Sequence, residues 1–405
     1  MSQDLSAKAR KNQRNALWAG FMGWTLDAFD FFVLTFILAS VGREFHMSIP
    51  KMALTLTASL AMRPLGALVF GLLADRYGRK TPLILNILFY SVVEVLSGLA
   101  PSYTIFLILR LLYGIGMGGE WGVGASMVME SVSARKRGLL SGLLQEGYAL
   151  GFLLAAAAYY LVFPAFGWRS LFFIGGLPAL LTLFIRARVE ETEAWKTHRS
   201  PSWRSYLKDI RANWKLFVYL IVLMSMMNLI SHGTQDLYPT FLEQQMHLGS
   251  RSTAVITMIS MVGAILGGLI FGQLSDRWGR KRMMALAAGL GILVIPLWLN
   301  TAGIYWIVLG AFLMQFMVQG AWGVIPAHIN ELSPDSLRGF FPGFAYQTGV
   351  LIASTIAYVE AVLAKSMTYA RSMELLASGV LLVGALVILA GPERRGKDFT
   401  GSRAS

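Results

Sequence analysis

Residues 71–80 read GLLADRYGRK, and residues 272–281 read GQLSDRWGRK. The two segments share a first glycine, an Asp-Arg pair and a final Gly-Arg-Lys, and they begin 201 residues apart. Each segment connects two long apolar runs. A polar loop that is duplicated in this way indicates that the chain contains two homologous halves.

The same offset aligns further segments of the two halves. It pairs Glu130 with Glu331, Arg137-Gly138 with Arg338-Gly339, Gly119-x-Trp121-Gly122 with Gly320-x-Trp322-Gly323, and Glu146 with Gln347. One constant offset over several predicted helices is hard to obtain by chance. The halves are therefore predicted to share one fold and to be related by an axis along the membrane normal.

The composition is that of a membrane protein. Of the 405 residues, 55% are hydrophobic and only 14% are charged, whereas soluble domains carry roughly 25% charged residues. A soluble chain of this length could not bury so much apolar surface, so the lipid bilayer is predicted to surround it. The chain has no cysteine, which excludes disulfides and thiol chemistry.

Twelve apolar runs are long enough to cross the bilayer, because a spanning helix needs about 20 residues. We place them near residues 16–41, 51–74, 82–99, 103–129, 138–163, 168–186, 215–242, 251–274, 283–300, 303–330, 338–363 and 371–391. The predicted fold class is therefore an all-α membrane protein with twelve transmembrane helices.

The basic residues indicate the orientation of the chain. The net charge is +13, and about 27 of the 35 Lys and Arg residues lie in loops on the side of both termini. This bias places the termini in the cytoplasm and argues against nucleic acid as a partner, because the charge follows the short loops. The longest hydrophilic segment, 187–214, is predicted to be a cytoplasmic linker between an N-terminal half (1–186) and a C-terminal half (215–405).

The duplicated loop, G-x-x-x-D-R-x-G-R-K, resembles the signature of the major facilitator superfamily, and the resemblance covers almost the whole chain. It implies two six-helix halves and secondary transport by alternating access. It also implies that the loops form cytoplasmic latches that are made in one conformation and broken in another. An alternative is that the loops only determine topology. The gating residues would be Asp75, Arg76, Arg79, Asp276, Arg277, Arg280, Glu130 and Glu331.

Several ionisable residues fall inside the predicted spans, where a charge is costly and usually functional. At 1.5 Å per residue, Arg63 lies roughly 18 Å from Asp75, which is near mid-membrane. Most of these residues belong to the first half, since Gln347 stands where the repeat would place a second Glu146. This asymmetry suggests that the first half handles protons. The candidates are Asp27, Asp30, Glu120, Arg110 and Glu146.

Arg110 begins the run RLLYGIGMGGEWG, in which spaced glycines allow helices to approach closely. The run resembles the fourth-helix motif of the superfamily. In proton-coupled members the arginine of this motif lies near an acid of the first helix, which here would be Asp27 or Asp30. Conformational change could then couple to protonation, because moving an arginine away from a carboxylate favours the neutral acid. The alternative is a static ion pair that only fixes helix packing.

The seventh apolar run carries a polar stripe. Asn228, His232, Gln235 and Asp236 have relative positions 0, 4, 7 and 8, so they share one face of a helix. Polar side chains on one face of a spanning helix are expected to face a cavity rather than lipid. Pro239 is expected to loosen the helix just beyond them. Simple interhelical hydrogen bonds are the alternative.

The stripe matches the pattern N-x-x-(S/T)-H-x-(S/T)-Q-D-x-x-x-T through Thr240, and thus resembles the lactate permeases and their bacterial relatives in the sialate:proton symporter family. Those relatives carry lactate, pyruvate and similar monocarboxylates with protons, and others in the family carry sialic acid. The resemblance implies that the stripe binds substrate together with Gln347. The residues that flank Gln347 differ from the family pattern. Arg63 offers a planar fork for a carboxylate, and a structural role for it is equally open.

The sequence thus predicts a proton-coupled symporter of small monocarboxylates, located in the cytoplasmic membrane. The alternatives are a proton symporter for another organic anion, such as a sialic, aromatic or sugar acid, and an uncoupled facilitator. We find no phosphate loop, metal-ligand cluster or nucleophile elbow in the sequence, so neither an enzyme nor a metal site is predicted. The expected partners are a small organic anion, protons and lipid, with no cofactor, and we expect a functional monomer.

Overall fold

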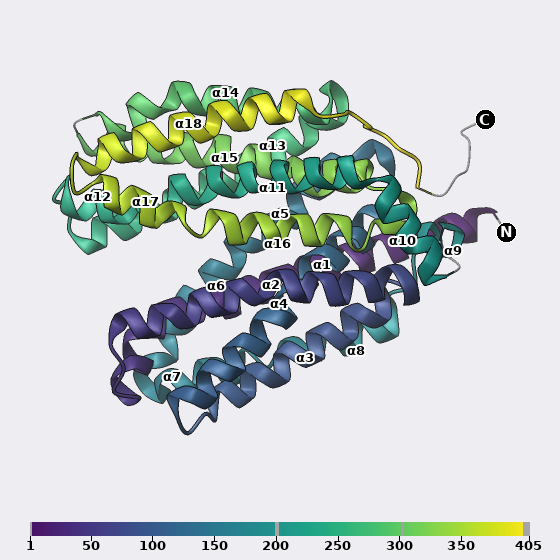
Figure 1. Cartoon of the computed structure of the whole chain (residues 1–405), viewed down its shortest axis with the longest axis horizontal. Coiled ribbons are helices and arrows are strands. Elements are labelled where there is room, and N and C mark those ends of the chain that lie inside the picture. The colour runs from purple at the N-terminus through teal and green to yellow at the C-terminus, as the bar shows by residue number, and fades with distance from the viewer. Residues whose placement is uncertain (1, 199–201, 302, 400–405) are drawn as a thin grey trace.

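The structure is a computed structural model that describes residues 2–198, 202–301 and 303–399. Within these ranges the chain is almost entirely helical (Figure 1). The first half contains α1 (Ser2–Glu44), α2 (Ile49–Tyr77), α3 (Lys80–Gly98), α4 (Tyr103–Ser131), α5 (Arg137–Gln145), α6 (Gly147–Leu161), α7 (Phe163–Ile174) and α8 (Pro178–Arg188). Two short helices follow, α9 (Glu193–His198) and α10 (Trp203–Ala212). The second half contains α11 (Trp214–Gln235), α12 (Tyr238–Gln244), α13 (Ser250–Trp278), α14 (Arg280–Leu299), α15 (Ile304–Leu332), α16 (Phe341–Ala353), α17 (Ile356–Leu363) and α18 (Tyr369–Ala390).

The described helices account for the predicted membrane spans. Eleven helical segments of the described ranges are long and apolar enough to cross a membrane. Helix α4 has the length, at 29 residues, but Arg110, Glu120 and Glu130 lower its apolarity. These charges are tolerated because most of α4 is buried among other helices and does not face lipid. With α4 the chain has twelve spans, which confirms the predicted fold class.

Some of the spans consist of two helices separated by a short break. The fifth predicted run consists of α5 and α6, which meet at Glu146. Helix α11 ends at Gln235, and α12 begins at Tyr238 with Pro239 in its first turn, where the sequence predicted a loosened helix. Helical hydrogen bonds persist at both breaks, from the Glu146 N–H to the Gly142 carbonyl and from the Asp236 N–H to the His232 carbonyl, each at 3.1 Å. The breaks are therefore local changes of direction.

The two halves form separate bundles that lie side by side, the first in purple to blue and the second in teal to yellow (Figure 1). They meet at the end that carries α9, α10 and both termini, and they diverge toward α7, α12 and α17. Helix α5 packs on α13, and α16 packs on α2. These two contacts are equivalent at the repeat offset, so the bundles are related by pseudo-symmetry.

Glycines set the distance between the halves. A Cβ atom on Gly122 of α4 would lie 2.5 Å from the Cα atom of Gly343 in α16. A Cβ atom on Gly142 of α5 would lie 2.4 Å from the carbonyl oxygen of Gly268 in α13. Side chains at these positions would meet backbone that cannot yield, so small residues are required for the close crossing.

We expect Gly122→Val to destabilise the protein by about 1–3 kcal/mol, because the added side chain overpacks the crossing of α4 and α16. The measurement is the apparent melting temperature in detergent. Gly289→Val on α14 is the matched control, since a Cβ atom there would meet nothing within 4 Å. Equal melting temperatures of the two variants would contradict this account of the interface.

Candidate functional site

The first duplicated loop joins the two halves at the cytoplasmic end. Asp75 accepts hydrogen bonds from the backbone N–H groups of Gly339 (2.6 Å) and Phe340 (3.1 Å), which precede α16. The same carboxylate pairs with Arg79 at 2.5 Å, and Arg79 extends to Glu130 at 2.8 Å. The two backbone donors therefore bind the first half to the second through a buried carboxylate, in charge-assisted hydrogen bonds.

The second duplicated loop makes the reciprocal contact. Asp276 accepts hydrogen bonds from the backbone N–H groups of Gly138 (2.8 Å) and Leu139 (3.1 Å) in the first half. Arg280 pairs with Asp276 at 2.8 Å and with Glu331 at 3.0 Å. The donors are the repeat equivalents of those that bind the first aspartate. We call the two contacts the Asp75 latch and the Asp276 latch.

The glutamates of the latches also bind arginines of the opposite half. Arg338 lies 3.2 Å from Glu130, and Arg137 lies 2.9 Å from Glu331. Of the predicted gating residues, Arg76 is half-buried at the end of α2 and Arg277 is exposed at the end of α13. The other six predicted gating residues all take part in the latch contacts described above: Asp75, Arg79, Glu130, Asp276, Arg280 and Glu331.

The linker and the C-terminal segment also contact the latches, which the sequence analysis did not predict. The Tyr206 hydroxyl of α10 donates to Asp75 at 2.9 Å. Burial raises the pKa of Tyr206 above its usual range, so the hydroxyl remains a donor. The Phe399 ring centre lies 3.8 Å from the guanidinium carbons of both Arg137 and Arg338. Single aromatic residues in polar segments carry no periodic signal that could have identified them.

A cavity of about 610 Å³ lies between the halves, away from the latches. Its wall comes from both halves and includes Phe36, Thr57, Tyr238 and Ser260. We call this cavity the vestibule. The structure is thus closed toward the cytoplasm and hollow toward the opposite side of the membrane.

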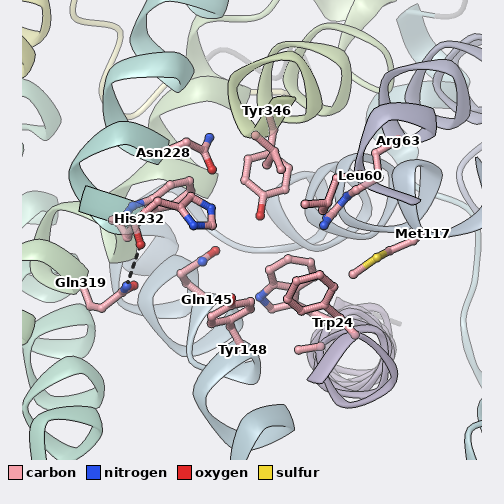
Figure 2. A pocket seen from close by; sticks show the side chains of 15 residues that line it. Trp24, Leu60, Arg63, Met117, Gln145, Tyr148, Asn228, His232, Gln319 and Tyr346 are labelled. Carbon is pink, nitrogen blue, oxygen red and sulfur yellow. Dashed lines mark hydrogen bonds between the residues drawn. The ribbon is translucent and has the colours of Figure 1, made fainter. Parts of the chain in front are cut away.

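A smaller chamber of about 50 Å³ adjoins the vestibule. Figure 2 shows side chains from both halves around it, and those that matter below are Trp24, Arg63 and Tyr148 from the first half and Asn228, His232 and Tyr346 from the second. Tyr148 and His232 line both cavities, so the chamber and the vestibule are adjacent. This chamber is the candidate substrate site.

Arg63 supplies a buried positive charge to the chamber. Its side chain is 4% exposed, and its guanidinium carbon lies 5.9 Å from the ring centre of Tyr346. Its Nε and Nη2 atoms have no hydrogen-bond partner among the described residues. A buried charge with unused donors is costly unless an anion or water meets it. The position therefore suits a carboxylate, which a guanidinium binds in a planar fork.

The polar stripe of α11 faces the two cavities, as its spacing predicted. Asn228 and His232 line the chamber, and His232, Gln235 and Asp236 line the vestibule. His232 Nδ1 lies 3.1 Å from a carboxylate oxygen of Asp236, and Gln235 donates to the Ser231 hydroxyl at 3.2 Å. These contacts hold the polar side chains at the cavity wall.

The structure places Gln347 between the halves and not in the chamber wall. Its Nε2 donates to the carbonyl oxygen of Gly118 in α4 at 3.3 Å. The residue of α16 that lines the chamber here is the preceding Tyr346. Neighbouring residues of a helix point about 100° apart, so the family pattern identified the helix but not the face that meets the cavity.

The acids of the first half lie behind the chamber. Asp27, Asp30 and Glu120 are buried, and none of them lines the chamber or the vestibule. Their carboxylate oxygens have no hydrogen-bond partner among the described residues. A Cβ atom on Gly23 would lie 2.3 Å from Glu120 Oε1, so Glu120 faces α1. Buried acids without hydrogen-bond partners are poor packing elements, and this leaves them as candidates for proton binding.

Arg110 forms its direct ion pair with an acid of α3. Its Nη2 atom lies 2.6 Å from Glu94 of α3 and 2.5 Å from the Ser97 hydroxyl. The sequence analysis placed Arg110 near Asp27 or Asp30 of α1, and Arg110 does act electrostatically on Asp30, although it forms no direct pair with it. Depth along a helix places residues at a common level of the membrane but does not say which neighbouring helix a side chain faces.

Glu146 is separated from the other acids. It occupies the break between α5 and α6 and faces α13 of the second half, where a Cβ atom on Gly268 would lie 1.9 Å from Glu146 Oε1. The predicted proton-handling residues therefore fall in two places: a group inside the first half and a single acid between the halves.

Sequence comparison identifies the class of protein. The Major Facilitator Superfamily profile matches residues 20–357 and 237–404, so the chain belongs to this superfamily of membrane transporters. The likeness to solved structures shows the same fold. The proton:xylose symporter XylE bound to 6-bromo-6-deoxy-D-glucose superposes with a TM-score of 0.76 at 18% identity, over 96% of this chain and 98% of that one.

Curated relatives resemble the chain over most of its length. A carboxylic acid transporter protein homolog of Saccharomyces cerevisiae is 28% identical over 95% of this chain and 69% of its own. A probable 4-methylmuconolactone transporter of Cupriavidus pinatubonensis is 30% identical over 95% of this chain and 91% of its own. The sialic acid transporter NanX of Escherichia coli is 29% identical over 96% of both chains. The protein is therefore a multi-pass transporter of the cytoplasmic membrane and not an enzyme.

We expect Asp75→Asn to favour opening of the cytoplasmic end by about 1–3 kcal/mol, because the uncharged amide weakens its bonds to two backbone donors and to Arg79. The measurement is labelling of a cysteine introduced by Ser141→Cys, which is fully buried in this structure. The native chain contributes no background thiol.

The matched control for this variant is Glu193→Gln, which removes an exposed pair with Lys196 that contributes little. Labelling of Ser141→Cys should accelerate in the Asp75→Asn background and stay unchanged in the Glu193→Gln background. Equal labelling rates in the two backgrounds would show that the Asp75 latch does not hold the cytoplasmic end closed.

Proposed function

We propose that the protein is a proton-coupled symporter that takes up small organic acids, with a short monocarboxylate as its substrate. The observation that carries this proposal is the buried Arg63 in the chamber wall, where two guanidinium nitrogens have no hydrogen-bond partner among the described residues and both halves contribute to the wall. An anionic carboxylate supplies the charge and the acceptors that this guanidinium lacks. The names of the relatives, several of which denote carriers of acids, support the same substrate class.

The size of the chamber supports a small substrate. A space of about 50 Å³ suits an acid of few heavy atoms, held by Arg63 at one side and by Asn228 and His232 at the other. The amide and the imidazole can hydrogen-bond a 2-hydroxyl or 2-keto group, which lactate and pyruvate carry. The second candidate is a larger organic acid, whose carboxylate would sit at Arg63 while its body occupies the vestibule of about 610 Å³.

The proposed coupling ion is the proton. The buried acids Asp27, Asp30 and Glu120 lie on α1 and α4, the helices whose Trp24, Ala28 and Met117 line the chamber. Arg63 acts electrostatically on Asp27 and Glu120. An anion that binds at Arg63 offsets the charge that stabilises the nearby carboxylates, so a proton and the anion favour each other's binding. One proton with one monoanion would be an electroneutral step.

Arg63→Gln should raise the KM for the transported acid about ten- to hundredfold, because a hydrogen bond to a charged partner contributes about 1.5–3 kcal/mol. The assay is uptake into proteoliposomes under an imposed pH gradient, with labelled lactate, pyruvate, acetate, benzoate and sialate compared. Arg371→Gln is the matched control, since Arg371 is exposed and pairs only with Glu374 among the described residues.

The outcomes of this screen separate the candidates. Uptake of lactate or pyruvate alone supports the short monocarboxylate, whereas uptake of sialate or benzoate alone supports the larger acid in the vestibule. Uptake without any response to the pH gradient would exclude proton coupling. Electroneutrality has its own test: each net charge carried would contribute about 2.3 kcal/mol per 100 mV, so uptake that follows an imposed voltage contradicts it.

A further inference from the structure

Glu146 lies between the two halves, whereas Asp27, Asp30 and Glu120 lie inside the first half. Its side chain lines a small cavity of about 10 Å³ between the halves, and its Oε1 atom has no hydrogen-bond partner among the described residues. Of the described side chains that line this cavity from α5, α6, α11, α13 and α15, only Tyr148 and Glu146 itself are titratable. The remaining polar or apolar side chains are Gln145, Ala149, Gln235, Met261, Ala264 and Gln319.

The backbone carbonyl of Gln319, in the opposite half, lies near Glu146. From the position that a Cβ atom on Gly268 would take, Glu146 Oε1 lies 1.9 Å away and the carbonyl oxygen of Gln319 lies 3.5 Å away. The carboxyl and the carbonyl are therefore both close neighbours of Gly268. Two oxygens without a hydrogen between them repel, so an ionised Glu146 gains nothing from this arrangement, whereas a neutral one donates an O–H to the carbonyl.

The other side of the pseudo-symmetric interface shows the bond in its completed form. Gln347 is the repeat equivalent of Glu146, and Gly118 is the repeat equivalent of Gln319. Gln347 donates its amide to the Gly118 carbonyl at 3.3 Å. An amide makes this bond at any pH, whereas an acid in the same place makes it only when it carries a proton.

We propose that Glu146 is a proton-binding residue whose neutral carboxyl completes the second of two equivalent hydrogen bonds between the halves, from Glu146 to the Gln319 carbonyl. The role of Glu146 in transport rests on the proposed function, and the inference identifies Glu146 as the residue at which the coupling proton acts. A proton on Glu146 stabilises the form that is closed toward the cytoplasm. Without it, one of the two bonds is missing and that form is less stable.

The same contact reaches the substrate site. The side chain of Gln319 donates to the Ser231 hydroxyl at 3.4 Å, as the dashed line in Figure 2 marks, and Gln235 donates to the same hydroxyl. Both amides line the Glu146 cavity as well as a larger cavity: Gln319 the chamber and Gln235 the vestibule. A proton on Glu146 therefore orders the residue that supports the polar stripe.

This geometry gives an order of events. A proton enters from the vestibule, whose wall shares Tyr148 and Gln235 with the Glu146 cavity. The neutral carboxyl donates to the Gln319 carbonyl and organises the stripe, and the organic acid then binds at Arg63. When the cytoplasmic end opens, water reaches the carboxyl, which releases its proton to the cytoplasm and loses the bond.

The test compares wild type with Glu146→Gln, whose amide donates at every pH. Labelling of Ser141→Cys from the cytoplasmic side should accelerate with rising pH more steeply in the wild-type background than in Glu146→Gln, after normalisation to denatured protein. For wild type, the Kd of the transported acid should weaken by up to about tenfold per pH unit above the titration point. In Glu146→Gln it should stay constant, with counterflow exchange retained and pH-driven accumulation lost.

Gln347→Glu is the reciprocal control, since it makes the completed bond dependent on protonation and should steepen the pH response. Equal pH slopes in wild type and Glu146→Gln, or normal pH-driven accumulation by Glu146→Gln, would overturn the inference while leaving the proposed function intact. The labelling experiment needs no substrate. If wild type accumulates none of the acids, the proposed function fails, and the labelling slopes still decide the role of Glu146. Melting temperatures show whether both variants fold.

Discussion

The structure depends on two carboxylates, one buried and one largely shielded from water, each of which is satisfied by backbone of the opposite half. Asp75 and Asp276 would be costly to hold away from water without the N–H donors at 339–340 and 138–139. Those donors are present only while the cytoplasmic ends of the halves touch. The contact is therefore made completely or lost to solvent, and this supplies the two discrete arrangements that alternating access requires.

The pseudo-symmetry extends to the segments that follow the last helix of each half, α8 and α18. Glu191 in the linker accepts hydrogen bonds from the first backbone N–H groups of α3, and Glu393 after α18 accepts those of α14. A carboxylate at a helix N-terminus is favoured by the unpaired donors and by the helix dipole. The two glutamates are 202 residues apart, one residue from the repeat offset, so nearly equivalent positions of the two halves meet the same electrostatic demand.

The repeat, the twelve spans and the loop chemistry could be predicted because they depend on local pattern and on a constant offset. The partners of single side chains could not. The sequence places Arg110 at the right level but cannot say that α3, with Glu94, lies on its side of the bundle. The α11 stripe was predictable because four spaced residues define a face. Gln347 was one residue on a helix, and one residue carries no information about its direction.

The differences between the halves explain why a symmetric fold can move a proton and an acid together. Equivalent positions hold Glu146 in one half and Gln347 in the other, so only one of two matching contacts can respond to a proton. Arg63 stands in the first half, whereas the residues that would read the rest of the substrate stand on α11 of the second. A bound anion therefore draws the halves together around itself. Within the proposed function, the halves close around the substrate only when the proton is bound at Glu146 and the organic anion at Arg63. The proton first completes the Glu146 contact between the halves, and the anion then binds to residues of both halves.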